Sequence, residues 1–269
     1  MKIYAIEIPT QSIPEGTFNK LLLLMEPQGR DRIKRFRLWD DSLRSLVARL
    51  SMTWYLHTSG LLVNDELPTF GRKGKGKPIL STPIPHPPLE FNNTHESHFI
   101  LLSILRSHSP LACVGIDIMS PGPDPLETQE GISYQLTTRE KLSLAGKMTD
   151  EERNKRLMNL WTLKEGYTKA VGEGITFGLE RIEVILDDYG DVQGVKIDGK
   201  DSEEIGWEYR LGWVGECRWA VWWRGDDAED GLQSGGQGEG GVVHVGWEEF
   251  EKPLLDLVDK LGLDKDGQI

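Results

Sequence analysis

Two different spacings of hydrophobic positions run along this chain, and the changes between them mark the predicted elements. Apolar residues recur at steps of three and four between residues 30 and 57, which predicts one long helix from Arg30 to His57. Apolar and polar residues alternate in several other stretches, as is typical of half-buried strands. The predicted strands are MKIYAIEI, EFNNTHESHFILLSIL, ACVGIDIM, LERIEVILDD, DVQGVKI, WEYRLGWVG, CRWAVWWRG and VVHVGW.

Two short motifs predict where further helices begin. TTRE at residues 137–140 and TDEE at residues 149–152 have the form Ser/Thr-x-x-Glu, in which the first and last side chains satisfy free backbone N–H groups reciprocally. The second motif opens a helix that is predicted to run to about Val171. EEFEKPLLDLVDKLG predicts a short amphipathic helix near the end of the sequence.

The composition is typical of a globular protein and argues against several other classes. Hydrophobic residues make up 38% and charged residues 28% of the 269 residues. No apolar run approaches the ~18 residues of a membrane-spanning helix, and the first residues lack the features of a signal peptide. Cys113 and Cys217 are far apart, which favours reduced structural thiols. We therefore expect a cytoplasmic protein with no membrane partner.

The net charge of −12 is unevenly distributed along the chain. Residues 1–111 carry 14 Lys and Arg against 10 Asp and Glu, whereas the remainder carries 17 against 33. An acidic protein does not usually bind nucleic acid non-specifically, so no nucleic-acid partner is expected. The basic first part instead favours a small anionic ligand or an acidic protein partner. Residues 225–241 are acidic and glycine-rich, which predicts a disordered loop.

The run GRKGKGKPIL, residues 71–80, nearly matches a nucleotide-binding P-loop. The frame G-x-x-x-x-G-K is present, but Pro78 stands where a Ser or Thr hydroxyl would hold Mg²⁺. A P-loop leads from a buried strand directly into a helix, and the prolines that follow this run disfavour a helix. The four cationic side chains of the run still suit an anion, so the kind of phosphate site remains open at this point.

Two carboxylates stand out by their positions. Asp117 lies among apolar residues of the predicted strand ACVGIDIM, where an ionised carboxylate needs a partner, solvent or a metal. A surface aspartate on a half-exposed strand is an equally good interpretation. Trp161, Glu165 and Lys169 recur every four residues on one helix face, and such a Glu–Lys pair usually does no more than stabilise a helix surface.

Taken together, VGIDI and WTLKEGYTKAVGEGI resemble the paired signatures of the 4′-phosphopantetheinyl transferases, in particular the long, broad-specificity surfactin type. That family has a G-[IV]-D strand and a W-x-x-K-E-x-x-x-K helix about forty residues later. Residues 114–118 and 161–169 match both in order. MKIYAIEI, GRDRIKRFRLWDDSLRSLVAR, GKPIL and FNNTHESHFIL resemble the family's first strand, basic helix, G-K-P and F-N-x-S-H motifs, with Thr94 where Ser is common.

The resemblance implies a fold, a reaction and substrates. It implies an α+β fold of two similar α/β halves related by pseudo-twofold symmetry, here residues 1–111 and 112–269. One chain then builds a complete site, so the resemblance also implies a monomer. Family members transfer the phosphopantetheine arm of coenzyme A to a serine of an acyl or peptidyl carrier protein with Mg²⁺, and release adenosine 3′,5′-bisphosphate. On this interpretation GRKGKGKPIL contacts coenzyme A. The sequence does not indicate which carrier proteins are modified.

The family's functional residues correspond to individual positions here. Asp117 and Glu165 match the metal-binding acids, and Glu165 would also accept the serine proton, directly or through a metal-bound water. Lys169 matches the catalytic lysine that contacts the pyrophosphate, and Lys164 fits the motif without a firm role. The arginines and the histidine among the expected coenzyme A contacts would meet the 3′-phosphate. These contacts are Arg32, Arg35, Arg44, Lys77, Thr94, His95 and Lys169.

One position departs from the bacterial members, which carry a second acid two residues after the aspartate. This chain has Met119, whose thioether is a poor Mg²⁺ ligand. The sequence also resembles the eukaryotic subclass that reads G-[IV]-D-I-M, which favours a site where water takes that position. The alternative is a catalytically weak relative that binds coenzyme A and a carrier without efficient transfer.

Carrier domains are generally acidic, so the basic first helix is expected to help recruit them.

Overall fold

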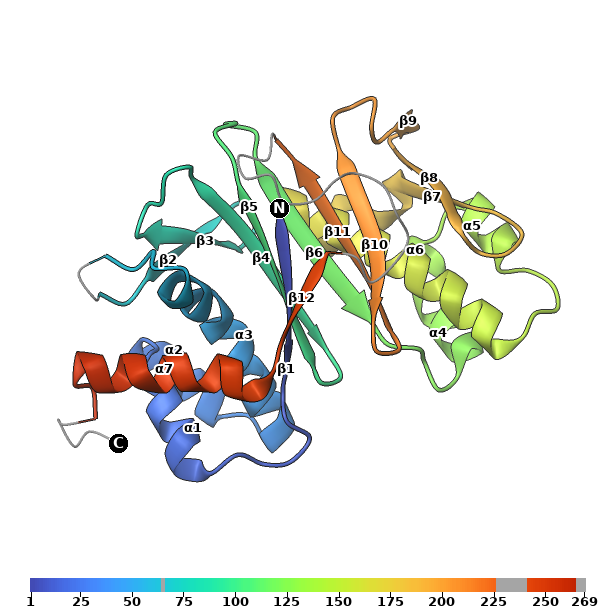
Figure 1. Cartoon of the computed structure of the whole chain (residues 1–269). Coiled ribbons are helices and arrows are strands. Elements are labelled where there is room, and N and C mark those ends of the chain that lie inside the picture. Colours follow the sequence, from blue (N-terminus) through green and yellow to red (C-terminus); the bar gives the residue numbers. More distant parts are fainter. Residues whose placement is uncertain (64–65, 226–240, 265–269) are drawn as a thin grey trace.

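The chain folds as an α+β protein, as its sequence predicts. The computed structural model describes residues 1–63, 66–225 and 241–264. In these residues two β-sheets lie face to face, and helices cover the outer face of each sheet (Figure 1). The predicted loop at residues 225–241 falls almost wholly on residues 226–240, which lie outside the described ranges, and it stays a prediction.

The first sheet has the strand order β12-β1-β5-β4, and one of its faces packs against a group of helices. β1 pairs antiparallel with β5 and parallel with β12. Leu46 of α3, Ile100 of β5 and Phe250 of α7 are fully buried where the helices meet the sheet. The elements of this part are β1 (Lys2–Glu7), α1 (Glu15–Leu22), α2 (Pro27–Lys34), α3 (Trp39–Thr58), β4 (Leu89–Glu96), β5 (Phe99–Arg106), β12 (Val242–Val245) and α7 (Trp247–Leu261).

The second sheet is antiparallel with the strand order β10-β11-β6. One face meets the first sheet through buried residues that include Ile3, Leu101, Ile116 and Trp219, and the other face packs against α6. β6 is therefore covered on both sides, because alternate side chains enter two different cores. The elements here are β6 (Cys113–Met119), α4 (Pro125–Ile132), α5 (Thr138–Ser143), α6 (Asp150–Val171), β10 (Glu208–Val214) and β11 (Cys217–Arg224).

Smaller elements complete the described part of the chain. Three short strands form a separate sheet in the order β7-β8-β9 beside α5 and α6. Three 3₁₀ turns link the longer elements. The bounds are η1 (Ser133–Gln135), η2 (Gly174–Phe177), η3 (Leu179–Arg181), β7 (Ile182–Leu186), β8 (Val192–Ile197) and β9 (Lys200–Asp201).

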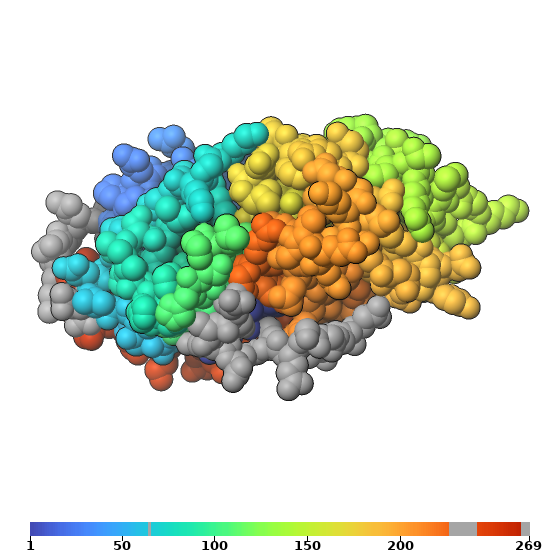
Figure 2. Space-filling view, turned by 90° about the horizontal axis from the view of Figure 1, so that it is seen from above, coloured from blue at the N-terminus to red at the C-terminus, as the bar shows by residue number. Residues whose placement is uncertain are grey.

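GRKGKGKPIL lies in a β-hairpin formed by β2 (Thr69–Lys73) and β3 (Lys77–Thr82). A P-loop is excluded, because the run leads into a second strand and not into a helix. The hairpin lies against the end of α6, where Lys75 Nζ donates to Thr176 Oγ1 at 2.7 Å and Lys77 Nζ donates to Ala170 O at 2.9 Å. In Figure 2 this contact is the line where the teal surface meets the yellow one.

The prediction of one helix from Arg30 to His57 is wrong, because α2 ends at Lys34 and α3 begins at Trp39. Ser42 Oγ donates to Ile33 O at 3.1 Å and so satisfies a carbonyl at the end of α2. Asp40 and Asp41 lie in the first turn of α3, where negative charge favours a helix start. The apolar spacing continued across the break and hid it.

The prediction of a single strand EFNNTHESHFILLSIL is also wrong. β4 and β5 form a tight hairpin in which Glu96 pairs with Phe99, and Ser97 adopts a positive φ of 51° at the turn. The polar stretch at the turn was the available signal. By contrast, both predicted capping boxes are confirmed at Thr137 and Thr149, and α6 ends at Val171 as expected.

Residues near the end of the chain return to the first sheet. β12 pairs with β1, and α7 packs against α1 and α3. The division of the chain into residues 1–111 and 112–269 stays a prediction. Residues of both parts pack together in the core between the two sheets.

Candidate active site

The site begins with an unusually close contact between a strand and a helix. A Cβ placed on Gly115 of β6 would overlap backbone atoms of Gly166 and Ala170 on α6. Gly166 in turn approaches Ala220 O and the Trp222 ring, each 3.1 Å from the position of an added Cβ. Two glycines therefore let α6 lie directly on the sheet. This contact sets the polar face of α6 next to the end of β6.

Asp117, Lys169 and Thr94 meet at this contact. Lys169 Nζ on α6 lies 2.5 Å from Asp117 Oδ1 on β6 and donates to Thr94 Oγ1 on β4 at 3.0 Å. The Thr94 hydroxyl donates to the same Asp117 oxygen at 3.3 Å. The three side chains come from two sheets and one helix. Asp117 is 5% exposed, so the interpretation of a solvated surface aspartate is wrong.

Glu165 completes the group one helical turn before Lys169. Its Oε1 atom and the Oδ2 atom of Asp117 are both buried and have no hydrogen-bond partner among the described residues. Buried carboxylate oxygens are rarely left without a donor, because each loses its hydration without compensation. These two oxygens therefore indicate a place for a further positive or donating group.

Burial sets the electrostatics of both acids. Loss of hydration raises the pKa of Asp117, and the ammonium of Lys169 and the hydroxyl of Thr94 oppose that shift. Loss of hydration also raises the pKa of Glu165, the charge of Asp117 raises it further, and Lys169 opposes both effects. The three charged groups thus act on one another as a single cluster.

A divalent metal fits this donor set. Mg²⁺ takes oxygen ligands and is commonly held by one or two carboxylates, with waters and phosphate oxygens in the remaining positions. Asp117 and Glu165 supply two carboxylates whose unpartnered oxygens are buried. The described ranges contain no group of three or more His, Cys, Asp or Glu side chains suited to a metal. Within the described ranges the site therefore offers two acids and no third.

Position 119 lies beside a buried arginine. Met119 pairs with Arg218 across β6 and β11, and Arg218 is 4% exposed. Its Nε donates to Asn159 Oδ1 at 2.7 Å, and its guanidinium lies 4.8 Å from the centre of the Trp213 ring. Burial lowers the pKa of Arg218 to about 10.

His95 and Arg44 lie next to the cluster. Arg44 Nε donates to Ser97 O at 3.2 Å, and its Nη1 donates to Asp41 Oδ1 at 2.9 Å. The surface of His95 is open to solvent, yet the protein around it desolvates the imidazole, and Arg44 and Lys169 repel its positive charge. These effects lower the pKa of His95. The predicted contacts Arg44, Thr94, His95 and Lys169 are thus brought together.

The other predicted coenzyme contacts lie apart from this group. Arg32 and Arg35 are exposed near the end of α2. Lys77 Nζ donates to Val114 O and Ala170 O, each at 2.9 Å, and lies 3.6 Å from Glu90 Oε2. Its side chain is only 6% exposed, and burial lowers its pKa. In this structure Lys77 joins the β2–β3 hairpin to β6 and α6, and its contact with coenzyme A stays a prediction.

A cavity of about 800 Å³ opens beside His95, between α3, the β2–β3 hairpin and β4. Arg49 and Arg72 line it together with Phe70, Pro78 and Phe91. Burial lowers the pKa of Arg49, and the charges of Arg32 and Arg72 lower it further. The cavity thus has apolar walls and closely spaced arginine side chains, which suits a ligand that has both a ring and phosphate groups.

Sequence reasoning missed two residues of this region, Arg49 and Asn92. Arg49 was not among the predicted coenzyme A contacts, whereas Arg72 was included as part of the run GRKGKGKPIL. Asn92 lies in the F-N-x-S-H motif, and its Oδ1 accepts from Ile116 N at 3.0 Å. This bond ties β4 to β6, and so it holds Thr94 next to Asp117.

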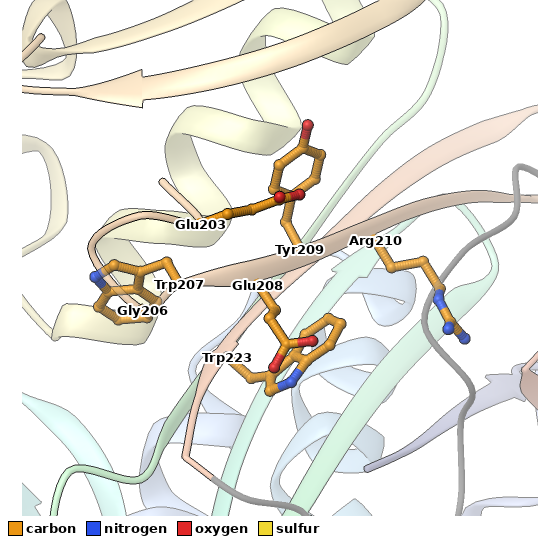
Figure 3. Close-up of a pocket in the computed structure, with 7 residues that line it drawn as sticks. All are labelled: Glu203, Gly206, Trp207, Glu208, Tyr209, Arg210 and Trp223. Carbon is orange, nitrogen blue, oxygen red and sulfur yellow. The ribbon is translucent and has the colours of Figure 1, made fainter. Parts of the chain in front are cut away.

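A second cavity of about 610 Å³ lies along β10 and the turn before it (Figure 3). Tyr209 points to the opposite side of the strand from Glu208 and Arg210. None of the predicted site residues lines this cavity. The lining residues are Glu203, Gly206, Trp207, Glu208, Tyr209, Arg210 and Trp223.

Comparison with known proteins agrees with this geometry. Residues 113–213 match the family described as the 4′-phosphopantetheinyl transferase superfamily. Residues 13–105 match a second family, described as the 4′-phosphopantetheinyl transferase, N-terminal. The matched segments contain the β6–α6 site and the basic helix with β4, respectively.

Individual relatives support the same assignment. A 4′-phosphopantetheinyl transferase of Paxillus involutus is 32% identical over 223 residues, which cover 78% of this chain and 81% of the relative. A phosphopantetheinyl transferase of a Thraustochytrium species is 27% identical, over 74% of this chain and 70% of the relative. The L-aminoadipate-semialdehyde dehydrogenase-phosphopantetheinyl transferase of Xenopus laevis is 30% identical, over 59% of this chain and 53% of the relative.

The solved structures that match include a holo-(acyl-carrier-protein) synthase from Bacillus anthracis in complex with coenzyme A (3′,5′-ADP). It is 24% identical, covers 42% of this chain and 96% of its own, and has a TM-score of 0.32. Two sheets and a helix bring the paired acids of this site together. The sequence relatives show that this chain belongs to the 4′-phosphopantetheinyl transferase family. The predicted resemblance and the prediction of an enzyme are confirmed.

Proposed function

We propose that this chain transfers the 4′-phosphopantetheine group of coenzyme A to a serine of an acyl or peptidyl carrier protein, depends on Mg²⁺ and releases adenosine 3′,5′-bisphosphate. The observation that carries the proposal is the cluster of Asp117, Glu165 and Lys169, with its two unpartnered carboxylate oxygens. Transfer from a pyrophosphate requires neutralisation of its charge and removal of a proton from the attacking hydroxyl. The cluster contains groups for both tasks.

The cavity beside His95 supports coenzyme A as the donor. Its volume of about 800 Å³ lies in the usual range for ligand sites, and it is lined by Arg49, Arg72 and aromatic residues. An adenine ring would pack against the apolar walls, and the arginines would meet the phosphates. His95 at one end is electrostatically coupled to Lys169, so the cavity leads toward the acids. The pyrophosphate would then lie between the cavity and Asp117.

Each residue of the cluster has a task in this reaction. The serine oxygen attacks the phosphorus that carries the pantetheine arm, and the bond to the oxygen of the leaving adenosine bisphosphate breaks. Glu165 takes the serine proton, directly or through water, and its raised pKa brings the carboxylate closer to the strength of an efficient base. Lys169 donates to the phosphate oxygens. When bound by Asp117 and Glu165, Mg²⁺ would neutralise charge on the pyrophosphate.

Mass spectrometry of a purified apo carrier protein tests the proposal. After incubation with the chain, coenzyme A and Mg²⁺, the carrier should gain about 340 Da, the mass of one phosphopantetheine arm. Asp117→Ala and Glu165→Ala should abolish the gain. Glu130→Ala, which changes an exposed carboxylate on α4, should leave it unchanged. Absence of the gain with several unrelated carriers would refute the transferase activity.

A second candidate is a relative that binds coenzyme A and a carrier without efficient transfer. Met119 favours it, because the described residues provide two acids and no third. Binding of coenzyme A measured by calorimetry, without any mass gain on the carrier, would identify this case. Repeating both experiments with a chelator of Mg²⁺ would show whether binding or transfer depends on the metal.

We also propose a monomer in the cytoplasm. The cluster is assembled within one chain, so no second copy is needed to complete it. The described part of the chain has no helix long and apolar enough to cross a bilayer. Light scattering on the purified protein and fractionation of cells that express it test the two statements.

A further inference from the structure

Lys169 occupies the position of a cation next to Asp117. Its Nζ lies 2.5 Å from Asp117 Oδ1, and the hydroxyl of Thr94 bonds to both groups. The second oxygen of Asp117 and the Oε1 atom of Glu165 are buried without a hydrogen-bond partner among the described residues. The ammonium thus satisfies only part of the negative charge that the site contains.

We infer that Lys169 is a place-holding cation. Its ammonium neutralises Asp117 until the pyrophosphate of coenzyme A draws it away, so the acids take a divalent cation weakly before coenzyme A binds and tightly afterwards. The inference rests on the proposed function and adds an order of loading to it. Coenzyme A and the metal would then bind with positive coupling.

The contrast with a fully buried ion pair between α6 and α5 supports this inference. Lys164 and Glu140 form a pair in which neither side chain is exposed, and both carboxylate oxygens of Glu140 accept further hydrogen bonds. In the pair of Lys169 with Asp117, the lysine side chain is 29% exposed and one carboxylate oxygen lacks a donor. The first pair is complete, whereas the second can exchange its cation.

The charges around the pair favour the same order. Before any ligand binds, the ammonium of Lys169 lies 2.5 Å from Asp117 Oδ1. A divalent cation entering alone would therefore compete with the ammonium for this oxygen. A bound pyrophosphate supplies negative charge that can hold the ammonium and the metal at the same time.

Binding of Mn²⁺ to the full chain without coenzyme A gives the first test. Mn²⁺ replaces Mg²⁺ as a spectroscopic probe, and electron paramagnetic resonance counts the free ion. Lys169→Met should bind Mn²⁺ on the order of tenfold more tightly than the wild type, because the competing ammonium is gone. Asp117→Asn should lose the site.

A matched control separates competition from general electrostatics. Arg44→Met removes one positive charge near the site, but Arg44 bonds to Ser97 and Asp41 and not to Asp117. Its Mn²⁺ affinity should stay within about twofold of the wild type. Equal tightening in Arg44→Met and Lys169→Met would overturn the inference, and so would an unchanged affinity in Lys169→Met. If thermal unfolding shows that Lys169→Met is not folded, Lys169→Gln takes its place.

The coupling with coenzyme A gives the second test. Coenzyme A should tighten Mn²⁺ binding of the wild type by a larger factor than that of Lys169→Met, whose acids are already free. Adenosine 3′,5′-bisphosphate lacks the pyrophosphate and should tighten the wild type less than coenzyme A does. Equal coupling in both proteins would overturn the inference.

These measurements can refute the place-holding role of Lys169 and the proposed transfer separately. Loss of coupling in a protein that still modifies a carrier would refute the place-holding role and leave the transferase intact. Intact coupling without modification of any carrier would refute the transfer and leave the inference standing.

Discussion

Lys164 and Glu140 form an ion pair from which solvent is excluded, with Nζ 2.9 Å from Oε2. The lysine also donates to the carbonyls of Leu179 and Ile182, and the glutamate accepts from Val184 N at 2.8 Å. The pair thus joins α5, α6 and the start of β7. The first lysine of the W-x-x-K-E-x-x-x-K helix therefore points into the protein interior and bonds away from Asp117.

Removing one partner of this pair should destabilise the fold. Lys164→Met leaves the carboxylate of Glu140 buried without its cation, and the free energy of unfolding should fall by about 3–5 kcal/mol. Glu140→Gln in the same chain should restore part of the loss, because the neutral amide can still accept from the backbone. Urea unfolding measures both effects. Unchanged stability together with lost transfer would contradict the structural role and would give Lys164 a place in the chemistry.

Gly115→Ala should also be strongly destabilising, for a different reason. An added Cβ would overlap the backbone of α6, which must then move away from β6, and the expected cost is about 3 kcal/mol. Gly131→Ala on α4 is the matched control, because no atom lies within 4 Å of an added Cβ there. It should change stability by less than about 1 kcal/mol. Equal effects of the two substitutions in thermal unfolding would show that the close contact is not required.

The metal-free protein should gain stability at neutral pH from Glu165→Gln. The raised pKa of Glu165 means that the folded chain holds this proton more tightly than the unfolded chain. The carboxyl therefore contributes fully to folding below its ordinary pKa of 4.5, and that contribution is lost as the pH rises through the higher folded value. Glutamine cannot ionise and keeps the contribution. Unfolding temperatures in a chelator should therefore differ at pH 7 and converge near pH 4.

The control for this experiment is an exposed acid. Glu130→Gln on α4 should show no pH-dependent difference from the wild type, because Glu130 is open to solvent. A gain of similar size in Glu130→Gln would attribute the effect to net charge and not to burial of Glu165.

Arg49 should contribute to coenzyme A binding through its place in the cavity. Arg49→Met keeps the length of the side chain and removes its charge, so the dissociation constant for coenzyme A should rise about tenfold. Arg37→Met is the control, since Arg37 is exposed between α2 and α3 and does not line the cavity. Calorimetry at two salt concentrations measures both. A larger loss in Arg37→Met would move the phosphate site out of the cavity.

Local signals predicted the secondary structure where they were strong. The two Ser/Thr-x-x-Glu motifs gave the starts of α5 and α6, because capping depends only on residues four positions apart or closer. The apolar spacing failed between Lys34 and Trp39, because a break that keeps the same buried face leaves no trace in the pattern. Its cause, the bond from Ser42 to Ile33 O, depends on how the two helices pack.

The sequence predicted the residue types of the site, but not the features that depend on how distant segments pack. Asp117 and Glu165 belong to two recognisable motifs, so their types and order suggested a metal site. Periodicity alone left Asp117 undecided, since the helix that buries it comes from a distant part of the sequence. Lys77 carries the same charge as Arg72, and only the fold shows that Arg72 lines the cavity whereas Lys77 is buried against the carbonyls of Val114 and Ala170.

The return of β12 and α7 to the first sheet has a consequence for how the molecule is made. The core around α3 includes Phe250, Leu254 and Leu257, which leave the ribosome after the whole of the second sheet. The second sheet and α6 can fold while the first core still lacks one wall. During synthesis α3 therefore stays partly uncovered until α7 is released. Chains stalled before Trp247 should accordingly carry a protease-sensitive first sheet beside a resistant second one.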